Sequence, residues 1–317
     1  MFHAVKRETY LDNDICHMHT GTGRESLFPF CIADVFYGAA RIVYYFTRQR
    51  GNELRYNTDH TFAVCAYKES PYLDECVRSL VEQTVKTNIA VYTSTPNDYI
   101  RGVADKYGVP VYVNENAGQG IQADWNFAYN SAKTRYVTVA HQDDVYDRNY
   151  VKALLKCARY YDDWSIFYVD YTPVKNGDYS KRDVNSRIRR FLRWPVKNKD
   201  KADRAWRKKM SLCLGNTIVC PLVTYNKGRL GDNVFTSDYD FNLDWDTFYK
   251  LACMPGRFLY VDKVLGHYRV HDGATSKEFI VDHRREREDR SMFEKFWPKW
   301  IAGLIMVFYK LAYRTYG

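Results

Sequence analysis

The sequence has no long uninterrupted apolar segment and no closely paired cysteines. Leu27–Phe46 reaches spanning length but contains Asp34 and Arg41. The apolar run Ile301–Tyr309 falls well short of the ~20 residues that a membrane-spanning helix needs. The eight cysteines show no CxxC spacing, which argues against zinc and redox motifs of that kind, and several lie in apolar runs typical of buried thiols. With no recognisable cleavable signal either, we expect a reducing, cytoplasmic location.

One segment contains few acidic residues and accounts for the whole net positive charge of the chain. Residues 175–209 contain 14 Lys and Arg against four Asp, whereas the complete chain has a net charge of only +9. Because a nucleic-acid binder would spread basic residues over a face of the fold, we expect no nucleic-acid partner. Phe191, Trp194 and Trp206 lie among the cations. The pattern indicates short amphipathic helices broken at Pro195, which are either simply solvated or bind an anionic membrane or a phosphate-bearing acceptor.

Strand-like and helical patterns alternate from Thr61 onward. Apolar strand-like runs at 61–67, 88–94, 109–113, 135–140 and 165–171 are separated by segments with apolar residues at helical spacing. Further strand-like runs follow at 215–226 and 257–262. This order predicts an α/β fold with a mainly parallel sheet sandwiched by helices. Ligands bind beyond the carboxyl ends of such strands, so the candidate site residues include Tyr67, Glu69, Thr93 and the run His141–Asp144.

Two adjacent carboxylates, Asp143 and Asp144, directly follow the fourth strand. Neighbouring carboxylates repel each other, so they need a cation or several hydrogen-bond donors unless they are fully solvated. Hard oxygen ligands suit Mg²⁺ or Mn²⁺, which keep water ligands and bridge to substrate phosphates. The alternative is an ordinary solvated turn, and the position at a strand end favours the metal site.

Five short motifs occur in order between Thr61 and Ser276. They are Ala66–Glu69, Asn116–Gly118, His141–Asp144, Leu243–Asp246 and Tyr268–His271. They resemble, respectively, the Tyr-Asn-Glu-like stretch, the Asn-x-Gly segment, the DxD motif in its DQDDVW form, the acidic pair with its W-D-L-W-L-like helix, and the closing YRxH signature of one family. The chain therefore resembles the GT-A fold glycosyltransferases of family 2, in particular bacterial polysaccharide-type members, whose fold is Rossmann-like.

The resemblance implies a metal-dependent, inverting transfer of a sugar from a nucleotide diphosphate sugar to an acceptor hydroxyl. It implies Mg²⁺ or Mn²⁺ as cofactor, with Asp143 as metal ligand and Asp144 and His271 completing the site. Asp244 corresponds to the catalytic base, and Asp246 is the competing carboxylate. The expected nucleotide-sugar contacts are Tyr67, Glu69, Thr93, Asn116, Gln142, Asp143 and Arg269.

Three departures from the family pattern limit what can be carried over. Thr93–Thr95 replaces an acidic stretch, His141 replaces the first Asp of DxD, and Leu243 replaces a Glu. UDP- and dTDP-linked donors both stay open, as does a non-catalytic nucleotide-sugar-binding protein. A sugar nucleotidyltransferase would need a Gly-rich phosphate loop after the first strand, and Ala66–Tyr72 contains no glycine.

The chain is expected to divide into three parts. Residues 1–57 form an extension to which we assign no role, residues 58–276 form the catalytic domain with the basic insertion at 175–209, and residues 277–317 form an amphipathic helical segment. Trp and Lys residues flank the apolar run of that segment, which suits a helix in a membrane interface or one packed on the domain. The expected acceptor is lipid-linked or a polysaccharide, and the expected location is cytoplasmic, peripheral on the inner face of the plasma membrane.

Overall fold

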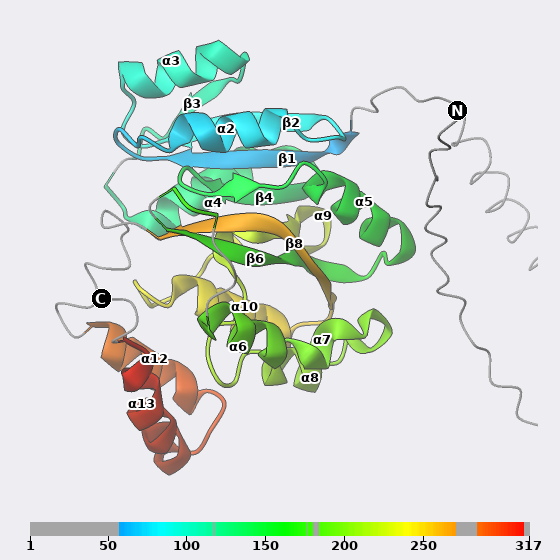
Figure 1. Cartoon of the computed structure of the whole chain (residues 1–317), viewed down its shortest axis with the longest axis vertical. Helices are drawn as coiled ribbons and strands as arrows, with labels where there is room; N and C mark the ends of the chain where they lie inside the picture. The colour runs from blue at the N-terminus through cyan, green and yellow to red at the C-terminus, as the bar shows by residue number, and fades with distance from the viewer. Residues whose placement is uncertain (1–56, 117, 176, 180–183, 271–283, 314–317) are drawn as a thin grey trace, which may run out of the picture. The chain divides into compact units, whose positions relative to one another are not determined.

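An eight-stranded sheet lies at the centre of the fold, with the strand order β3-β2-β1-β4-β7-β6-β8-β5 (Figure 1). Its strands are β1 (Asn57–Ala66), β2 (Thr87–Thr93), β3 (Val111–Val113), β4 (Tyr136–His141), β5 (Val145–Tyr146), β6 (Trp164–Lys175), β7 (Val223–Asn226) and β8 (Arg257–Val270). The pairs β1–β2, β1–β4, β2–β3 and β6–β8 are parallel, whereas β7 is antiparallel to both β4 and β6. The predicted α/β fold with a mainly parallel sheet is confirmed.

The computed structural model describes residues 57–116, 118–175, 177–179, 184–270 and 284–313, all within a compact unit that begins at Leu54. Of the extension expected at residues 1–57, only Asn57 lies among them. The α-helices are α2 (Leu73–Val81), α3 (Asp98–Tyr107), α4 (Ile121–Ser131), α5 (Tyr150–Tyr160), α6 (Val184–Leu192), α7 (Trp194–Lys197), α8 (Ala205–Met210), α9 (Lys227–Leu230), α10 (Leu243–Cys253), α12 (Arg284–Glu294) and α13 (Lys299–Tyr313). Two 3₁₀ turns, η1 (Lys199–Lys201) and η2 (Cys220–Leu222), complete the description.

Helices cover both faces of the sheet, and each face has its own core. In β1, Phe62 and Val64 pack with α2, α3 and α5, while Ala63 faces the opposite core, which contains residues of α4, α10, α12 and α13. A central parallel strand buried on both faces must be apolar throughout, which explains the continuous apolar run in β1. Because β1 is parallel to both β2 and β4, the carboxyl ends of these three strands lie at one edge of the sheet.

Two strands depart from their sequence expectation. The strand-like run at 215–226 yields only the four-residue β7, preceded by η2. By contrast, β8 continues beyond the expected 257–262 to Val270 and pairs with β6 along its length. This extension carries Arg269 into the sheet beside the turn that holds Asp143 and Asp144. Tertiary pairing, rather than the local pattern, sets the length of both strands.

The basic insertion forms α6, α7, η1 and α8. Helix α6 ends at Leu192 and α7 begins at Trp194, so Pro195 lies in the first turn of α7, where its missing N–H costs nothing. Farther along the chain, α12 packs against α10, with the Trp245 and Phe293 ring centroids 5.1 Å apart, and α13 packs against α12. Among the described residues, no helix has the length and apolarity needed to cross a bilayer.

Candidate active site

The turn between β4 and β5 presents the paired carboxylates. Asp144 is fully buried, and its Oδ1 accepts a hydrogen bond of 2.8 Å from the backbone N–H of Arg269. Its Oδ2 is also buried and has no hydrogen-bond partner among the described residues. Burial raises the pKa of Asp144 well above its usual range, and the neighbouring charge of Asp143 adds to the shift. The solvated-turn interpretation therefore fails for Asp144, because its carboxyl group does not reach water.

His141 completes a group of three possible metal ligands. One ligand atom each from His141, Asp143 and Asp144 lie within 4.8 Å of one another. The His141 ring lies 4.9 Å from that of Trp125, and its buried Nε2 has no hydrogen-bond partner in the described part of the chain. Burial lowers the pKa of His141, which favours the neutral imidazole that binds metals. The predicted ligand His271 lies outside the described residues.

Arg269 fixes this turn from the side of β8. Its guanidinium donates from Nε to the Asp143 carbonyl at 2.9 Å and forms an ion pair with Glu75 at 2.5 Å. It also lies over the Tyr72 ring, 4.4 Å from the centroid, and the residue is 5% exposed. In this arrangement Arg269 holds the backbone of the carboxylate turn, and its contact with a nucleotide sugar stays a prediction.

Gln142 joins the ends of β1 and β4. Its side-chain amide accepts from the Tyr67 backbone N–H and donates to the Tyr67 carbonyl, both at 3.0 Å. The Tyr67 ring is 51% exposed, with the Lys68 amine 5.1 Å from its centroid, and Glu69 is also exposed. Of the expected nucleotide contacts in this region, Tyr67 and Glu69 are therefore accessible, and Gln142 positions Tyr67.

A carboxylate that sequence reasoning missed lies beyond the end of β2. Asp124, in the first turn of α4, accepts from the Ser94 hydroxyl at 2.9 Å and from the Asn114 amide at 3.1 Å. Thr93 is buried, and its hydroxyl accepts from the Thr95 backbone N–H. Asn116 is exposed. Asp124 thus places a carboxylate beside Ser94, just beyond the end of β2, and its position in a first helical turn was the available signal.

Asp244 lies in the first turn of α10 in a mainly buried setting. Its Oδ2 accepts from the Asn216 amide at 2.8 Å, and its Oδ1 accepts from the Trp245 backbone N–H at 2.7 Å. Burial raises the pKa of Asp244 to about 6, although these two hydrogen bonds and the charge of Arg189 act in the opposite direction. A carboxylate with a pKa near neutrality is suited to accept a proton.

Asp246, the competing carboxylate, is held in ion pairs. It is 1% exposed and pairs with Lys250 at 2.9 Å and with Lys295 of the segment joining α12 to α13. Burial alone would raise its pKa, but the two lysines outweigh burial and lower it. Asp246 is therefore tied to structural partners, while Asp244 keeps a raised pKa.

Cys220 links the two acidic regions. This buried thiol has its pKa raised by burial and further by the charges of both Asp244 and Asp144. The base candidate of α10 and the buried carboxylate of the turn after β4 thus both act electrostatically on one thiol.

Residues 61–218, about half of the chain, match the model of the family described as glycosyl transferase family 2. The chain belongs to this family. It is therefore a glycosyltransferase, and its motifs lie in the order that the family resemblance implied.

Solved structures of two glycosyltransferases share the fold. The crystal structure of S. aureus TarS 1–349 in complex with UDP has 15% identity and a TM-score of 0.55, over 78% of this chain and 70% of that chain. Its complex with UDP-GlcNAc gives a TM-score of 0.52 at the same identity, over 80% and 70%. The mannosyltransferase PcManGT from Pyrobaculum calidifontis, in complex with GDP-Man and Mn²⁺, has 16% identity and a TM-score of 0.51, over 86% and 79%. No curated protein sequence matches the chain.

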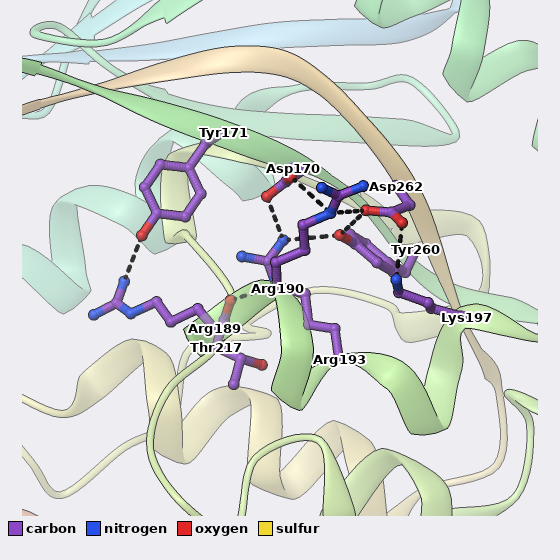
Figure 2. Close-up of polar contacts among 9 residues, drawn as sticks. All are labelled: Asp170, Tyr171, Arg189, Arg190, Arg193, Lys197, Thr217, Tyr260 and Asp262. Carbon is purple, nitrogen blue, oxygen red and sulfur yellow. Dashed lines mark hydrogen bonds and ion pairs between the residues drawn. The ribbon is translucent and has the colours of Figure 1, made fainter. Parts of the chain in front are cut away.

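The basic insertion of the glycosyltransferase is docked on the sheet through buried charge (Figure 2). Arg193 is fully buried and binds Asp170 at 3.0 Å, the Thr217 carbonyl at 2.9 Å and the Tyr260 hydroxyl at 3.3 Å. Arg190 and Lys197 pair with Asp262 of β8 at 2.6 and 2.9 Å. Some basic residues of the insertion thus form ion pairs within the protein, and these pairs hold α6 and α7 against β6 and β8.

Arg189 of α6 extends in another direction, toward Tyr171 of β6. Its guanidinium donates to the Tyr171 hydroxyl at 3.5 Å, and its charge lowers the pKa of Asp244 (Figure 2). The insertion therefore brings one cation near the candidate base, whereas Arg193 from the same helical segment points into the protein.

Proposed function

We propose that this glycosyltransferase moves a sugar from a UDP- or dTDP-linked donor to an acceptor hydroxyl with inversion, and that Asp244 is the catalytic base. The environment of Asp244 carries the proposal. It combines a pKa of about 6, hydrogen bonds from the Asn216 amide and the Trp245 backbone, and a nearby thiol, Cys220, whose pKa is raised by both Asp244 and Asp144. Asp246 remains the alternative base, and its two ion pairs make it the less suitable one.

In the proposed reaction, the Asp244 carboxylate takes the proton of the acceptor hydroxyl. The acceptor oxygen forms a bond to the anomeric carbon while the bond from that carbon to the diphosphate oxygen breaks, and the nucleoside diphosphate leaves with the bonding electrons. One displacement of this kind inverts the anomeric configuration. Asn216 orients the Asp244 carboxylate, since its amide donates directly to Oδ2.

The residues at the β4–β5 turn fit a divalent ion. His141 Nε2 and Asp144 Oδ2 are buried without hydrogen-bond partners among the described residues, and a cation would satisfy both. We propose that Mg²⁺ or Mn²⁺ is held by Asp143, Asp144 and His141, with His271 as a further ligand. When bound, such an ion neutralises charge on the diphosphate leaving group. The imidazole favours Mn²⁺ over Mg²⁺.

We further propose that the acceptor is anionic, as a lipid-linked or polysaccharide acceptor bearing phosphate would be. Arg189 is the cation that α6 places toward Asp244, and a guanidinium is well suited to a phosphate group. Action on a lipid-linked acceptor would place the enzyme on the cytoplasmic face of the plasma membrane. On the donor side, accessible Tyr67 and Glu69 would contact the nucleotide.

A panel of nucleotide sugars tests the proposed reaction. UDP-, dTDP- and GDP-linked sugars are each incubated with the enzyme, with Mn²⁺ or with a chelator, and nucleoside diphosphate release is measured. We expect metal-dependent release from a uridine or thymidine donor. Donor binding without turnover of any nucleotide sugar, in the presence of metal and candidate acceptors, would instead support the non-catalytic binding protein.

A further inference from the structure

The outer face of α13 exposes large apolar side chains. Trp300, Leu304, Val307 and Phe308 are 69%, 56%, 62% and 72% exposed. Their spacing of four, seven and eight residues places them on one side of the helix. The opposite side is covered, because Ala302 and Met306 belong to the core. Helix α13 therefore packs on the domain through one face and presents an apolar stripe on the other.

A second exposed apolar group lies on the basic insertion. Val184, Ile188 and Phe191 follow one side of α6 and are 71%, 49% and 70% exposed. Trp194 and Trp206 are each 49% exposed. These large apolar side chains lie on the surface and not in the core of the domain. A group of exposed apolar side chains of this size marks a site that binds a partner.

The two groups are connected through the end of α8. Met210 and Leu214, one helical turn apart in sequence, are 41% and 44% exposed. Gly215 approaches the Tyr309 ring of α13 so closely that an added Cβ would lie 3.2 Å from it. Figure 1 shows α6, α8 and α13 beyond the same side of the sheet, away from β3. We call the exposed side chains of α6–α8, Leu214 and α13 the basal apolar surface.

The charges around this surface indicate which kind of partner it binds. Arg187, Lys201 and Arg204 are exposed, whereas residues 184–210 contain only two acidic residues, Asp200 and Asp203. Residues 299–313 contain no acidic residue, and Lys299 at the start of α13 is exposed. Lys310 is already paired with Glu286 at 2.5 Å. Two copies of such a surface would bring like charges together, whereas anionic lipid headgroups would neutralise them.

We infer that the basal apolar surface docks on an anionic lipid membrane, with α13 lying in the plane of the interface. Its outward Trp, Leu, Val and Phe side chains enter the boundary between headgroups and acyl chains, and the exposed cations of α6–α8 contact the headgroups. This inference concerns binding to a surface and needs no sugar transfer, so its failure and that of the proposed reaction are distinguishable.

Vesicle flotation with the full chain tests the inference. Wild-type protein is mixed with phosphatidylcholine vesicles, with or without phosphatidylglycerol, and the fraction that floats is measured. We expect binding to the anionic vesicles, weakened by added salt because surface charges are screened. Leu304→Ser combined with Phe308→Ser should weaken that binding at least about tenfold, as should Ile188→Ser combined with Phe191→Ser, because each pair removes apolar contact with the lipid.

Matched controls separate lipid binding from folding and self-association. Tyr112→Ser changes an exposed aromatic residue of β3, on the other side of the sheet, and should leave flotation unchanged. Circular dichroism and thermal unfolding should show that both double variants fold, since all four side chains are exposed. Equal binding to neutral and anionic vesicles, or unaltered flotation of both folded double variants, would overturn the inference. So would a wild-type dimer in light scattering that dissociates with Leu304→Ser and Phe308→Ser and binds no vesicle.

Discussion

Asp244 and Asp246 are two residues apart on one helix, yet their surroundings give them opposite properties. Burial with a single side-chain amide donor raises the pKa of Asp244 to about 6, whereas two lysines keep Asp246 ionised at lower pH. We predict that transfer depends on ionised Asp244, so that kcat falls about tenfold per pH unit below about pH 6. A pH–rate profile measures this, and Asp244→Asn should lose transfer while keeping donor affinity.

The raised pKa of Asp244 also has a consequence for the stability of the fold. A carboxyl group with a folded pKa raised from 3.8 to about 6 stabilises the fold when protonated, and this contribution is lost as the pH rises through 6. Asp244→Asn should therefore raise the free energy of unfolding at pH 7.5, on the order of 1 kcal/mol. Asp246→Asn should lower it, because Lys295 and Lys250 lose their partner. Destabilisation by Asp244→Asn would contradict the proposed role.

His141 tests the metal site. We predict that His141→Ala reduces Mn²⁺ affinity at least about tenfold, since removing one of three ligands weakens a site by roughly that amount or more. Isothermal titration with Mn²⁺ alone measures the effect without a turnover assay. Asn126→Ala is a matched control, because Asn126 follows Trp125, which contacts the His141 ring, while its own side-chain amide donates to and accepts from the Phe235 backbone. Unchanged Mn²⁺ affinity in His141→Ala would remove the imidazole from the site.

Sequence patterns predicted these carboxylates but not the environments that distinguish them. The motifs identified Asp143, Asp144 and Asp244. Contacts between distant segments determine the rest: the position of His141 beside the carboxylates, the position of Asp124, and the bonds by which Arg269 holds the β4–β5 turn. Arg269, for example, reaches Glu75 across 194 residues of sequence. Residue type and spacing indicate which side chains can do the chemistry, and tertiary contacts decide which do.

Among the secondary-structure elements, the buried parallel strands could be predicted from the sequence, whereas the antiparallel pairings could not. Buried parallel strands such as β1 have continuous apolar runs. Strand β7 is only four residues long, and its pairing with β4 and β6 is not encoded in its own pattern. Likewise, the basic residues of the insertion resemble a solvated surface in sequence. Nothing in the local sequence shows that they will form ion pairs with Asp170 and Asp262.

Docking of the insertion therefore gives a prediction about Arg193. Arg193→Leu leaves the fully buried Asp170 without this partner, and breaking a buried ion pair costs about 3–5 kcal/mol. We expect a clear drop in the urea midpoint of unfolding. Arg187→Leu, a change in the same segment at an exposed position, should shift the midpoint little. Similar midpoints for the two variants would show that Arg193 does not anchor the insertion.

Beyond the region matched by the family, helix α12 supports the start of α10, the helix that carries the proposed base Asp244. The Glu288 carboxylate of α12 accepts hydrogen bonds from three successive backbone N–H groups, those of Asp240, Phe241 and Asn242. Asn242 immediately precedes α10, and its side chain also donates to Asp289 of α12. Helix α12 thus fixes the start of the helix that carries Asp244, although the family match ends at residue 218.

This coupling predicts that Glu288 affects catalysis although it lies outside the candidate active site. Glu288→Ala leaves three backbone donors without their carboxylate and loosens the start of α10, so kcat should fall about tenfold or more for a displacement of Asp244 by a fraction of an ångström. Donor KM should change little, because Tyr67, Glu69 and the β4–β5 turn belong to other elements. Glu294→Ala, also on α12 but paired with Arg290 on the same helix, is the matched control. Steady-state kinetics decide the matter: equal kcat in the two variants, or a rise in donor KM alone, would show that α12 does not position the base.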